Sequence, residues 1–257
     1  MRRASKIDHS HSFRRHQVTP EERDQLMFDT FQRLAPYYDR LLDVQSLGLH
    51  RYWRQVVVKI LTPSPGQCLL DVAGGAGEMA KRLAGPEHMV VVLDSSLSML
   101  NIGRARNNND LLWVAGLARA LPFTDNSLDA AVCAFGIRNV TYVDRALQEI
   151  FRVLKPGGRF VCLEVSRPWA AVRPFYHLFC RYVVPRLGMW VTRLPEVYEY
   201  LVDSIEDFPD YKEITQLFKD TGFNNVSCRR LTMGIVCLHI GTKPMVIVED
   251  INRKSGG

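Results

Sequence analysis

The chain has 257 residues, of which 47% are hydrophobic, and this is enough apolar material for one full core. One large α/β domain is therefore favoured over two small ones. The formal net charge of +6 is too small to indicate a nucleic-acid-binding protein, although it suits contact with an anionic membrane surface. The longest stretch between charged residues, Leu231 to Thr242, has about a dozen residues and falls short of the roughly eighteen that a membrane span needs.

Six cysteines are spread along the chain without a C-x-x-C spacing. Most of them lie in apolar, strand-like runs. We therefore expect reduced core residues in a cytosol-like compartment rather than disulfides or zinc ligands, and we expect no metal site.

The N-terminal part of the chain precedes the first strand-like run. Residues 1–25 are rich in basic residues and histidine with little periodicity, and we expect them to form a mobile arm. Apolar residues then recur at helical spacing from Leu26 to Leu42 and again from Leu47 to Ile60. Residues 63–66, with two prolines and a glycine, break the chain before the first strand.

A glycine cluster follows that first strand. The apolar run Cys68–Val72 leads directly into Gly74, Gly75 and Gly77, and a helix-capable segment follows. Glycine permits positive φ and close approach of a ligand, and a helix N-terminus offers unpaired N–H donors. The turn therefore predicts a nucleotide-like ligand, either a dinucleotide or S-adenosylmethionine. The order G-G-x-G departs from the dinucleotide fingerprint G-x-G-x-x-G.

An acid stands at the end of the next apolar run. Met89–Leu93 leads into Asp94, about twenty residues after the glycine turn. A carboxylate at this place can accept hydrogen bonds from both ribose hydroxyls of an adenosine cofactor. The alternative is a helix N-cap before residues 97–106. We favour the ribose role because the glycine turn and the acid occur together.

Strands and helices continue to alternate after Asp94. Strands are predicted at 111–115, 128–134 and 159–165, with helices at 97–106 and 143–154. This alternation is typical of βαβ units in a parallel sheet.

The regular alternation stops in the last third of the chain. Residues 168–209 are rich in aromatic residues and arginine and predict an inserted helical cap. A helix at 211–221 then precedes two strands, at about 224–231 and 234–242. The tight connection Thr232–Gly234 predicts an antiparallel hairpin at the edge of the sheet.

Four stretches carry a family resemblance: DVAGGAGE (71–78), AFGIRNV (134–140), RVLKPGGRFVCLEVS (152–166) and LTMGIVCLHIG (231–241). Together they resemble the ubiquinone/menaquinone biosynthesis C-methyltransferases of the UbiE type, over nearly the whole chain. The resemblance implies that a methyl group passes from S-adenosylmethionine to a ring carbon of a polyprenyl benzoquinol or a demethylmenaquinol.

The resemblance also implies the fold and the domain limits. We expect an α/β, Rossmann-like class I methyltransferase with a mostly parallel seven-stranded sheet, an antiparallel last strand and the helical cap insertion. The methyltransferase domain would cover residues 26–245, followed by a C-terminal tail at 246–257.

The cofactor residues implied by the resemblance come from several motifs. They are Asp71, Gly74, Gly75, Ala76, Gly77, Asp94, Leu117, Ala118 and Ala134. Three depart from the family pattern, because Ala76 replaces a threonine, Leu117 an asparagine or aspartate, and Ala134 the serine of some members. Each lost hydrogen bond would weaken cofactor binding by about 0.5–1.5 kcal/mol. Backbone contacts and Asp94 remain, so we still expect binding.

Arg138 and Asn139 are the first candidates for the chemistry. They follow the fourth strand of the sheet, at the carboxyl edge where ligands of open α/β folds bind. A quinol carbon becomes a good nucleophile when the neighbouring hydroxyl loses its proton. The Arg138 guanidinium could stabilise that phenolate or orient a deprotonating water, and Asn139 could hold the ring hydroxyl. The alternative for Arg138 is a salt bridge to a surface acid.

Tyr38 and His239 complete the catalytic candidates. Tyr38, carried over from a Tyr-Asp pair of the family, could shape the quinol pocket. His239 has the ordinary pKa of a general base near neutral pH, although a lone histidine in a closing strand is more often a core or edge residue. Glu164 could be a buried acid near the substrate or a hydrogen-bond partner at a strand end. His50 and Trp53 are expected to be structural.

The polyprenyl tail of the substrate bears on partners and location. Such a tail needs an apolar groove and contact with a bilayer, and arginine beside aromatic residues in the cap is typical of an interfacial surface. The alternative is an ordinary helix packed on the sheet. We expect a cytoplasmic protein, peripheral at the inner membrane face, with the mitochondrial matrix side of the inner membrane as the alternative. A quinone-biosynthesis complex or a homodimer is a further partner.

Two other functions stay open from the sequence. One is a methyltransferase of the same fold that acts on another small acceptor. The other is a non-catalytic scaffold of a quinone-synthesis complex, suggested by Ala76 and Leu117.

Overall fold

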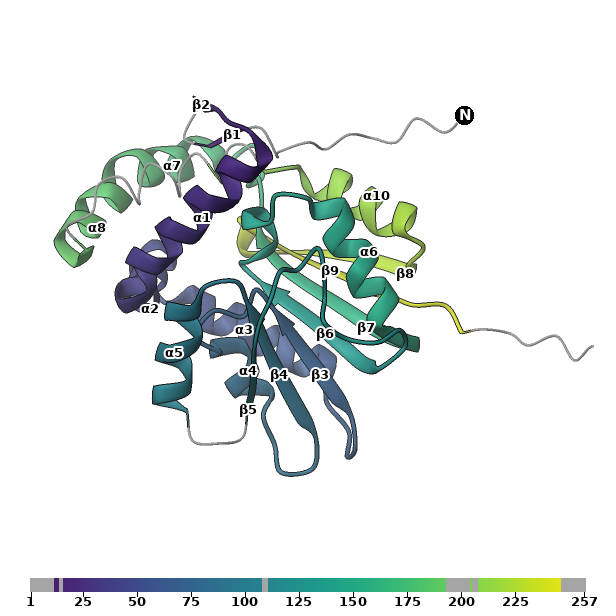
Figure 1. Cartoon of the computed structure of the whole chain (residues 1–257). Coiled ribbons are helices and arrows are strands. Elements are labelled where there is room, and N and C mark those ends of the chain that lie inside the picture. Colours follow the sequence, from purple (N-terminus) through teal and green to yellow (C-terminus); the bar gives the residue numbers. More distant parts are fainter. Residues whose placement is uncertain (1–11, 14–15, 108–110, 193–203, 205–207, 246–257) are drawn as a thin grey trace, which may run out of the picture.

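A seven-stranded sheet forms the centre of the computed structural model, which describes residues 12–13, 16–107, 111–192, 204 and 208–245 (Figure 1). The strands are β3 (Cys68–Val72), β4 (Met89–Asp94), β5 (Leu111–Ala115), β6 (Leu128–Ala134), β7 (Leu154–Val165), β8 (Asn224–Leu231) and β9 (Val236–Thr242). Their spatial order is β5-β4-β3-β6-β7-β9-β8. The first five strands run parallel, whereas β9 pairs antiparallel with both β7 and β8. The predicted sheet and its closing hairpin are confirmed.

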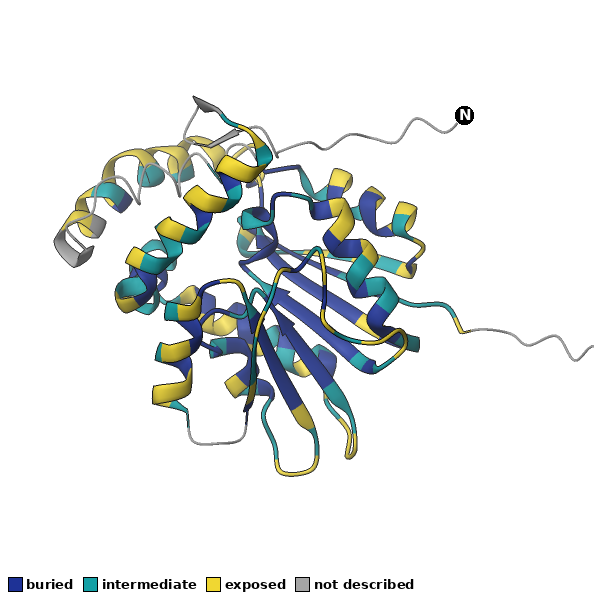
Figure 2. Cartoon of the chain, in the orientation of Figure 1, coloured by how far each residue is buried: buried dark blue, intermediate teal, exposed yellow. Residues whose placement is uncertain are grey.

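Two hydrophobic clusters cover the two faces of the sheet. Successive strand residues point to opposite faces, so Leu69 packs in one cluster and Leu70 in the other. On the face of Leu69 lie α3 (Leu49–Leu61), α4 (Glu78–Leu83) and α5 (Leu97–Arg106). On the other face lie α6 (Val143–Val153) and α10 (Tyr211–Thr221). The central strands β3, β4, β6 and β9 are mostly buried, which explains their continuous apolar runs, whereas the edge strands β5 and β8 are partly exposed (Figure 2).

The start of the N-terminal helix was predicted wrongly. The helix α1 spans Pro20–Leu34 and begins before the expected Leu26. Thr19 caps it, because its side chain accepts from the Glu22 amide while the Glu22 carboxylate accepts from the Thr19 amide at 2.7 Å. The acids that we placed in a mobile arm therefore belong to the first turn, where the helix dipole favours them. Residues 1–11 and 14–15 lie outside the described part of the chain.

The remaining N-terminal elements are short. Two strands, β1 (Ser12–Phe13) and β2 (His16–Gln17), pair antiparallel ahead of α1. After α1 come the 3-10 turn η1 (Ala35–Tyr37) and α2 (Tyr38–Ser46), which leads into α3.

The cap is helical where the structure describes it. It contains α7 (Arg173–Leu178), the π-helical η3 (Phe179–Val183) and α8 (Val184–Thr192). Val184 and Phe179 pack with Leu34 and Leu41, which joins the cap to α1 and α2. Residues 193–203 and 205–207 of the predicted insertion lie outside the described residues.

Strand β7 begins at Leu154 rather than at Arg159. Leu128 pairs with Leu154, and after a register shift Ala130 pairs with Arg159. The Pro-Gly-Gly sequence that we interpreted as a turn therefore forms an irregular start of the strand.

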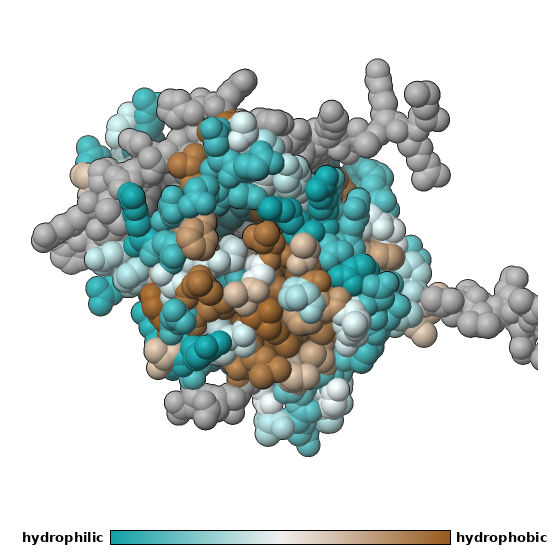
Figure 3. Space-filling view, viewed as in Figure 1, coloured by the Kyte–Doolittle hydropathy of each residue, from teal (hydrophilic) through white to brown (hydrophobic). Residues whose placement is uncertain are grey.

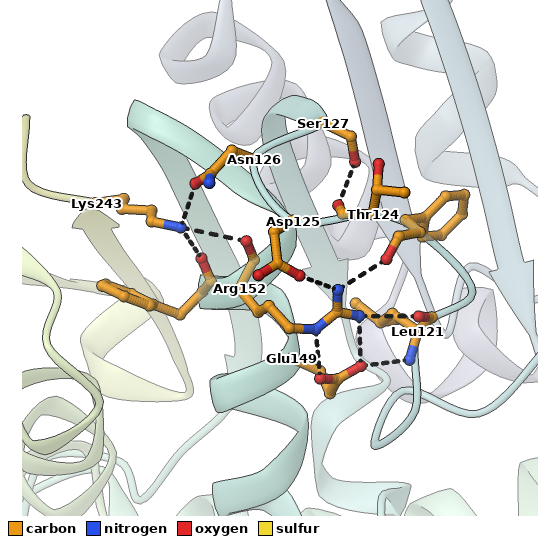
Figure 4. A network of polar contacts seen from close by, with 10 residues as sticks. Leu121, Thr124, Asp125, Asn126, Ser127, Glu149, Arg152 and Lys243 are labelled. Atoms are coloured by element: carbon orange, nitrogen blue, oxygen red, sulfur yellow. Dashed lines mark hydrogen bonds and ion pairs between the residues drawn. The ribbon is translucent and has the colours of Figure 1, made fainter.

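Arg152 ties the loop before β6 to α6 (Figure 4). Its Nε and Nη2 donate to the two carboxylate oxygens of Glu149 at 2.7 and 2.8 Å, and its Nη1 donates to Asp125 Oδ1 at 2.7 Å. It also donates to the carbonyl oxygens of Leu121 and Phe123. The loop that contains Leu117 and Ala118 is therefore anchored at its far end to a helix of the core.

Candidate active site

A cavity of about 410 Å³ opens at the carboxyl ends of the central strands. The ends of β3, β4 and β6 contribute Asp71, Asp94 and Ala134 to its lining. The helix α1 contributes a further wall with Met27 and Phe28. Ligands of open α/β sheets bind at this edge. In the orientation of Figure 1, the middle of the visible face is hydrophobic and its surroundings are largely hydrophilic (Figure 3).

The glycine loop after β3 follows a backbone path that few side chains tolerate. Ala73, Gly75 and Gly77 have φ angles of 52°, 57° and 79°. A Cβ atom at Gly74 would lie 2.8 Å from both Asp71 Cγ and Val92 Cγ1. The loop is therefore pressed against the end of the sheet, and Gly74, Gly75 and Ala76 line the cavity.

Asp94 is held by the glycine loop. Its Oδ2 accepts from the Gly75 amide and its Oδ1 from the Ser96 amide, both at 2.8 Å. Burial raises the pKa of Asp94, while these amide donors oppose that rise. Ser96, rather than Asp94, is the N-cap of α5. Each carboxylate oxygen keeps a second lone pair, so the cavity side of Asp94 can still accept from hydroxyl groups.

Asp71 is fully buried at the end of β3 and lines the cavity. Its Oδ2 accepts from the Ala80 amide at 2.9 Å, whereas its Oδ1 has no hydrogen-bond partner among the described residues. Burial raises the pKa of Asp71 to about 7, against the lowering effect of Arg54. A buried acceptor without a partner costs stability unless a ligand supplies a donor.

Of the other predicted cofactor residues, three line the cavity and one packs behind the glycine loop. Leu117, Ala118 and Ala134 line the cavity. Gly77 is not among the lining residues. It lies at the N-cap of α4, where a Cβ atom would lie 2.6 Å from the Trp113 ring.

Tyr38 and Asn139 both line the cavity. Burial raises the pKa of the Tyr38 hydroxyl, partly offset by the nearby charges of Arg138 and Arg54. The hydroxyl is therefore a neutral hydrogen-bond donor at physiological pH. Asn139 follows β6 in the turn η2 (Ile137–Asn139).

Arg138 lies outside the residues that line the cavity, so our prediction of its direct contact with a substrate needs correction. Its Nη1 donates to Glu164 Oε1 at 2.7 Å and to the Phe135 carbonyl at 2.8 Å. The exposed fractions of the Arg138 and Glu164 side chains are 4% and 2%. Arg138 turns away from the cavity because β6 and β7 run parallel, which brings the buried carboxylate of Glu164 in β7 beside the loop that follows β6. The salt bridge that we considered forms with this buried acid rather than with a surface acid.

His239 also lies away from the cavity. In β9 its Nε2 contacts the Tyr211 carbonyl at 2.9 Å, and its ring packs 5.7 Å from the ring of Phe218 in α10. Burial lowers the pKa of His239. The candidate base is therefore a core residue, because the antiparallel pairing of β9 turns it toward α10.

Arg54 is a residue of the cavity that the sequence analysis missed. It lies on α3, its exposed fraction is 3%, and it lines the cavity. Its guanidinium lies 5.5 Å from the centre of the Phe135 ring, and burial lowers its pKa. The only sequence signal was its spacing of four residues from His50, which places both on one face of a helix.

The helix α1 is fastened across the cavity by polar contacts. Arg23 is buried and donates to Thr141 Oγ1 at 3.0 Å and to the Arg138 carbonyl at 3.2 Å. Asp24 accepts from Thr141 and forms an ion pair with Arg119. Residues predicted to be a mobile arm therefore hold a wall of the site in place.

Comparison with known proteins places the chain in a family. The model of the ubiE/COQ5 methyltransferase family matches residues 18–243. The chain belongs to the ubiE/COQ5 methyltransferase family. The resemblance drawn from the four sequence motifs is thereby confirmed, and so is the class of enzyme.

Curated relatives in this family are similar over most of their length. A protein of Rubrivivax gelatinosus named ubiquinone/menaquinone biosynthesis C-methyltransferase UbiE is 44% identical over 91% of this chain and 93% of its own. The protein of the same name from Roseobacter denitrificans is 45% identical over 83% of this chain and 88% of its own.

Solved structures share the fold at low identity. A SAM-dependent methyltransferase from Thermotoga maritima has a TM-score of 0.61 and 23% identity over 84% of this chain and 99% of its own. Phosphoethanolamine N-methyltransferase 2 of Haemonchus contortus, in complex with S-adenosylhomocysteine, has a TM-score of 0.58 and 16% identity over 75% of this chain and 52% of its own. These likenesses confirm the class I methyltransferase fold predicted from the sequence.

Proposed function

We propose that this member of the family transfers a methyl group from S-adenosylmethionine to a ring carbon of a polyprenyl benzoquinol or a demethylmenaquinol. The observation that carries the proposal is one cavity that joins a glycine loop, a fixed carboxylate at Asp94 and an apolar wall from α1. The family membership and the names of the curated relatives support the same substrate class.

The residues of the cavity fit S-adenosylmethionine. Asp94 would accept from the ribose hydroxyls, and Leu117 and Ala118 would pack against the adenine. The Gly74–Ala76 backbone would approach the cofactor where a larger residue would collide with Asp71. Asp71 Oδ1, which has no hydrogen-bond partner in the described part of the chain, would take a donor from the ligand. When bound, the cofactor supplies an electrophilic methyl group on a sulfonium.

The chain's own groups would orient the second substrate. Tyr38 keeps its proton because burial raises its pKa, so it would donate to a ring oxygen. Asn139 would hold the same or the opposite ring oxygen from the other side of the cavity. Arg138 would act as a positioning residue: its ion pair with Glu164 fixes the loop that presents Asn139, and its positive charge favours a phenolate nearby. Phe28 and Phe31 would exclude water and pack against the first isoprene units.

A transfer assay tests this proposal. The protein is incubated with S-adenosylmethionine labelled in its methyl group and with short-chain demethylated benzoquinol or naphthoquinol, each kept reduced. We expect methylation of at least one reduced substrate and none of the oxidised quinones, because only the quinol can give a phenolate. Tyr38→Phe should lower the rate more than Tyr37→Phe, a control at the neighbouring tyrosine, which does not line the cavity. Transfer to neither quinol would refute the substrate class.

The cap would bring this site to the bilayer that holds the substrate. Exposed apolar side chains gather on it, with Phe175 at 74%, Leu178 at 58% and Trp169 at 50% exposure. The sequence from 167 to 192 contains four arginines and no acidic residue. Within the described residues no helix is long and apolar enough to cross a membrane. This composition suits contact with an anionic membrane surface, at the inner face of the membrane.

Vesicle flotation tests the membrane contact. Wild-type protein should float with vesicles that contain anionic lipid and much less with neutral vesicles. Phe175→Ser with Leu178→Ser should reduce flotation, whereas Leu112→Ser, at a leucine on β5 that is 50% exposed, should not. Equal flotation of all three proteins would contradict the proposed surface.

A further inference from the structure

A buried arginine of α1 reaches the loop that presents Asn139. Arg23 is 5% exposed and is not among the described residues that line the cavity, so any action on a substrate there is indirect. Its Nη2 donates to the Arg138 carbonyl at 3.2 Å, and its Nη1 donates to the Asn139 carbonyl at 3.3 Å. Nη1 also donates to Thr141 Oγ1 at 3.0 Å. One guanidinium therefore holds the loop at three points.

The two carbonyl groups lie at the end of the turn η2. Inside the turn, the Gly136 carbonyl accepts from the Asn139 amide at 3.0 Å and the next carbonyl accepts from the Val140 amide at 3.1 Å. The carbonyls of Arg138 and Asn139 come after this series, at the end where a helical turn leaves its carbonyls unpaired. Backbone carbonyls that are withdrawn from water need a donor. The guanidinium of Arg23 supplies one to each of them.

Holding these two carbonyls fixes the backbone on both sides of Asn139. The Arg138 carbonyl belongs to the planar peptide group before the Asn139 Cα atom, and the Asn139 carbonyl belongs to the peptide group after it. The soft torsions between the two planes are φ and ψ of Asn139, which set the direction of its Cβ atom. Arg23 therefore fixes the direction in which the side chain of Asn139 leaves the backbone at the edge of the cavity.

The loop needs this support because its first residue has a strained backbone. Phe135, directly after β6, has a φ of 63°, in the left-handed region that few bulky residues adopt. Strain of this kind persists only where the surrounding structure holds it. The ion pair between Arg138 and Glu164 holds the loop from the side of the sheet, and Arg23 holds it from α1.

The helix α1 carries its own hydrophobic contacts elsewhere. Its buried residues Met27 and Leu34 belong to a cluster with α2 and the cap, and not to the two clusters that cover the sheet. The hold of α1 on the loop after β6 therefore rests on Arg23 and on Asp24, which accepts from Thr141.

We propose that Arg23 is a positioning residue for methyl transfer, which holds both peptide groups around Asn139 and so keeps its carboxamide directed at a ring oxygen of the quinol. The inference rests on the proposed function, in which Asn139 holds that oxygen. Arg23 acts on the rate of transfer rather than on cofactor binding. Asn139 follows β6, whereas the cofactor contacts of Asp94 and Gly75 belong to the end of β4 and the turn after β3.

The test is a kinetic comparison with labelled S-adenosylmethionine and the reduced short-chain quinol that the wild type methylates. Arg23→Met keeps the approximate length of the side chain and removes its donors. We expect kcat to fall about 10- to 100-fold, because a small misplacement of a group that orients the substrate has a cost of this size. The affinity for S-adenosylhomocysteine, measured by calorimetry, should stay nearly unchanged.

Two further variants show whether the geometry of the guanidinium matters. Arg23→Lys keeps the charge and three donors but loses the planar fork, so it should retain an intermediate kcat. Arg33→Met is the matched control, because Arg33 lies exposed in the last turn of the same helix. It should keep the kcat of the wild type.

A double-variant cycle with Asn139→Ala separates positioning from a general loss of structure. In the Asn139→Ala background, Arg23→Met should lower kcat by less than about twofold, because the group that Arg23 positions is gone. A general structural defect would lower kcat by the same factor in both backgrounds. Single-turnover measurements with excess protein keep the slow variants measurable, and Arg23→Lys takes the place of Arg23→Met in the cycle if the latter does not fold.

The outcomes separate this inference from the proposed function. An Arg23→Met protein with the kcat of the wild type overturns the positioning role, and so does an equal loss in the two backgrounds. A loss of affinity for S-adenosylhomocysteine as large as the loss of kcat also overturns it. All three results leave the proposed function standing, because the wild type still transfers the methyl group. A wild-type protein that methylates neither quinol overturns the proposed function and the positioning role with it.

Discussion

The buried ion pair between Arg138 and Glu164 makes the sharpest prediction about stability. The two charges lie 2.7 Å apart, and both side chains are almost completely buried. Replacing either residue with methionine leaves the other charge without its partner in a site that excludes water. We expect each single variant to lose about 3–5 kcal/mol of unfolding free energy. That is a large part of the roughly 5–15 kcal/mol that holds a typical domain together.

The double variant should lose much less than the sum of the two single losses. Each single variant breaks the same ion pair and leaves the charge of the remaining partner buried, and the second substitution removes that remaining charge. We expect a coupling energy of about 2–3 kcal/mol, at the upper end for residues in direct contact. The measurement is urea unfolding of the four proteins with linear extrapolation to water.

Arg106 and Asp39 supply the matched control. Their ion pair has a similar length of 2.6 Å, but the side chains are 49% and 35% exposed. Breaking it should cost only about 0.2–1 kcal/mol, because solvent screens the charges. The prediction is refuted if the Arg138 and Glu164 variants lose only about 0.2–1 kcal/mol of unfolding free energy. It is also refuted if the loss in the double variant equals the sum of the two single losses to within about 0.5 kcal/mol.

Three further predictions concern the glycine loop, the buried acid beneath it and the Arg152 network. Gly74→Ala should weaken S-adenosylhomocysteine binding, because the new Cβ would lie 2.8 Å from the Asp71 carboxyl carbon; calorimetry that finds unchanged affinity would contradict this. Ligand affinity should rise as pH rises through about 7, since burial raises the pKa of Asp71 to about 7 and only the ionised form attracts an ammonium; Asp71→Asn should flatten the profile. Arg152→Met should lower the unfolding free energy by about 1–3 kcal/mol, because it strands backbone and carboxylate acceptors. In the folded protein Arg152 lowers the pKa of Glu149 below its usual 4.5. The stabilisation that Glu149 gains from Arg152 is therefore present above pH 4.5 and is lost as pH falls through the pKa of Glu149 in the folded protein. Acid unfolding of the wild type and of Arg152→Met would detect this loss.

The central strands could be predicted because their signal is local. Runs such as Cys68–Val72 are apolar throughout, as strands covered by helices on both faces must be. The start of α1 was missed because the basic composition before it concealed the capping pair of Thr19 and Glu22. A capping box is a sequence signal, so this boundary was within reach of the sequence.

The candidate site could be predicted where a short local motif marks each part of it. Gly74 and Gly75 lie just after β3 and Asp94 ends β4, and the edge of the sheet brings them together. Arg54 was missed because nothing near it in the sequence shows that α3 packs beside the glycine loop.

Arg138 illustrates a different limit. Its partner Glu164 was noticed separately, 26 residues further on, but their pairing depends on the register between β6 and β7. The side chain of Arg138 could point to a substrate or to a buried acid at the end of the neighbouring parallel strand. Tertiary packing decides between these two orientations, and the sequence motif around Arg138 does not reveal it.

The most direct measurement for the whole account is the position of the transferred methyl group. The protein would be given S-adenosylmethionine with a ¹³C-labelled methyl group and a reduced, short-chain demethylated quinol, and the product examined by carbon NMR. We predict the signal of a labelled methyl group that is bonded to a ring carbon next to a hydroxylated position. A label on oxygen, or no transfer to either quinol class by protein that binds S-adenosylhomocysteine, would contradict it.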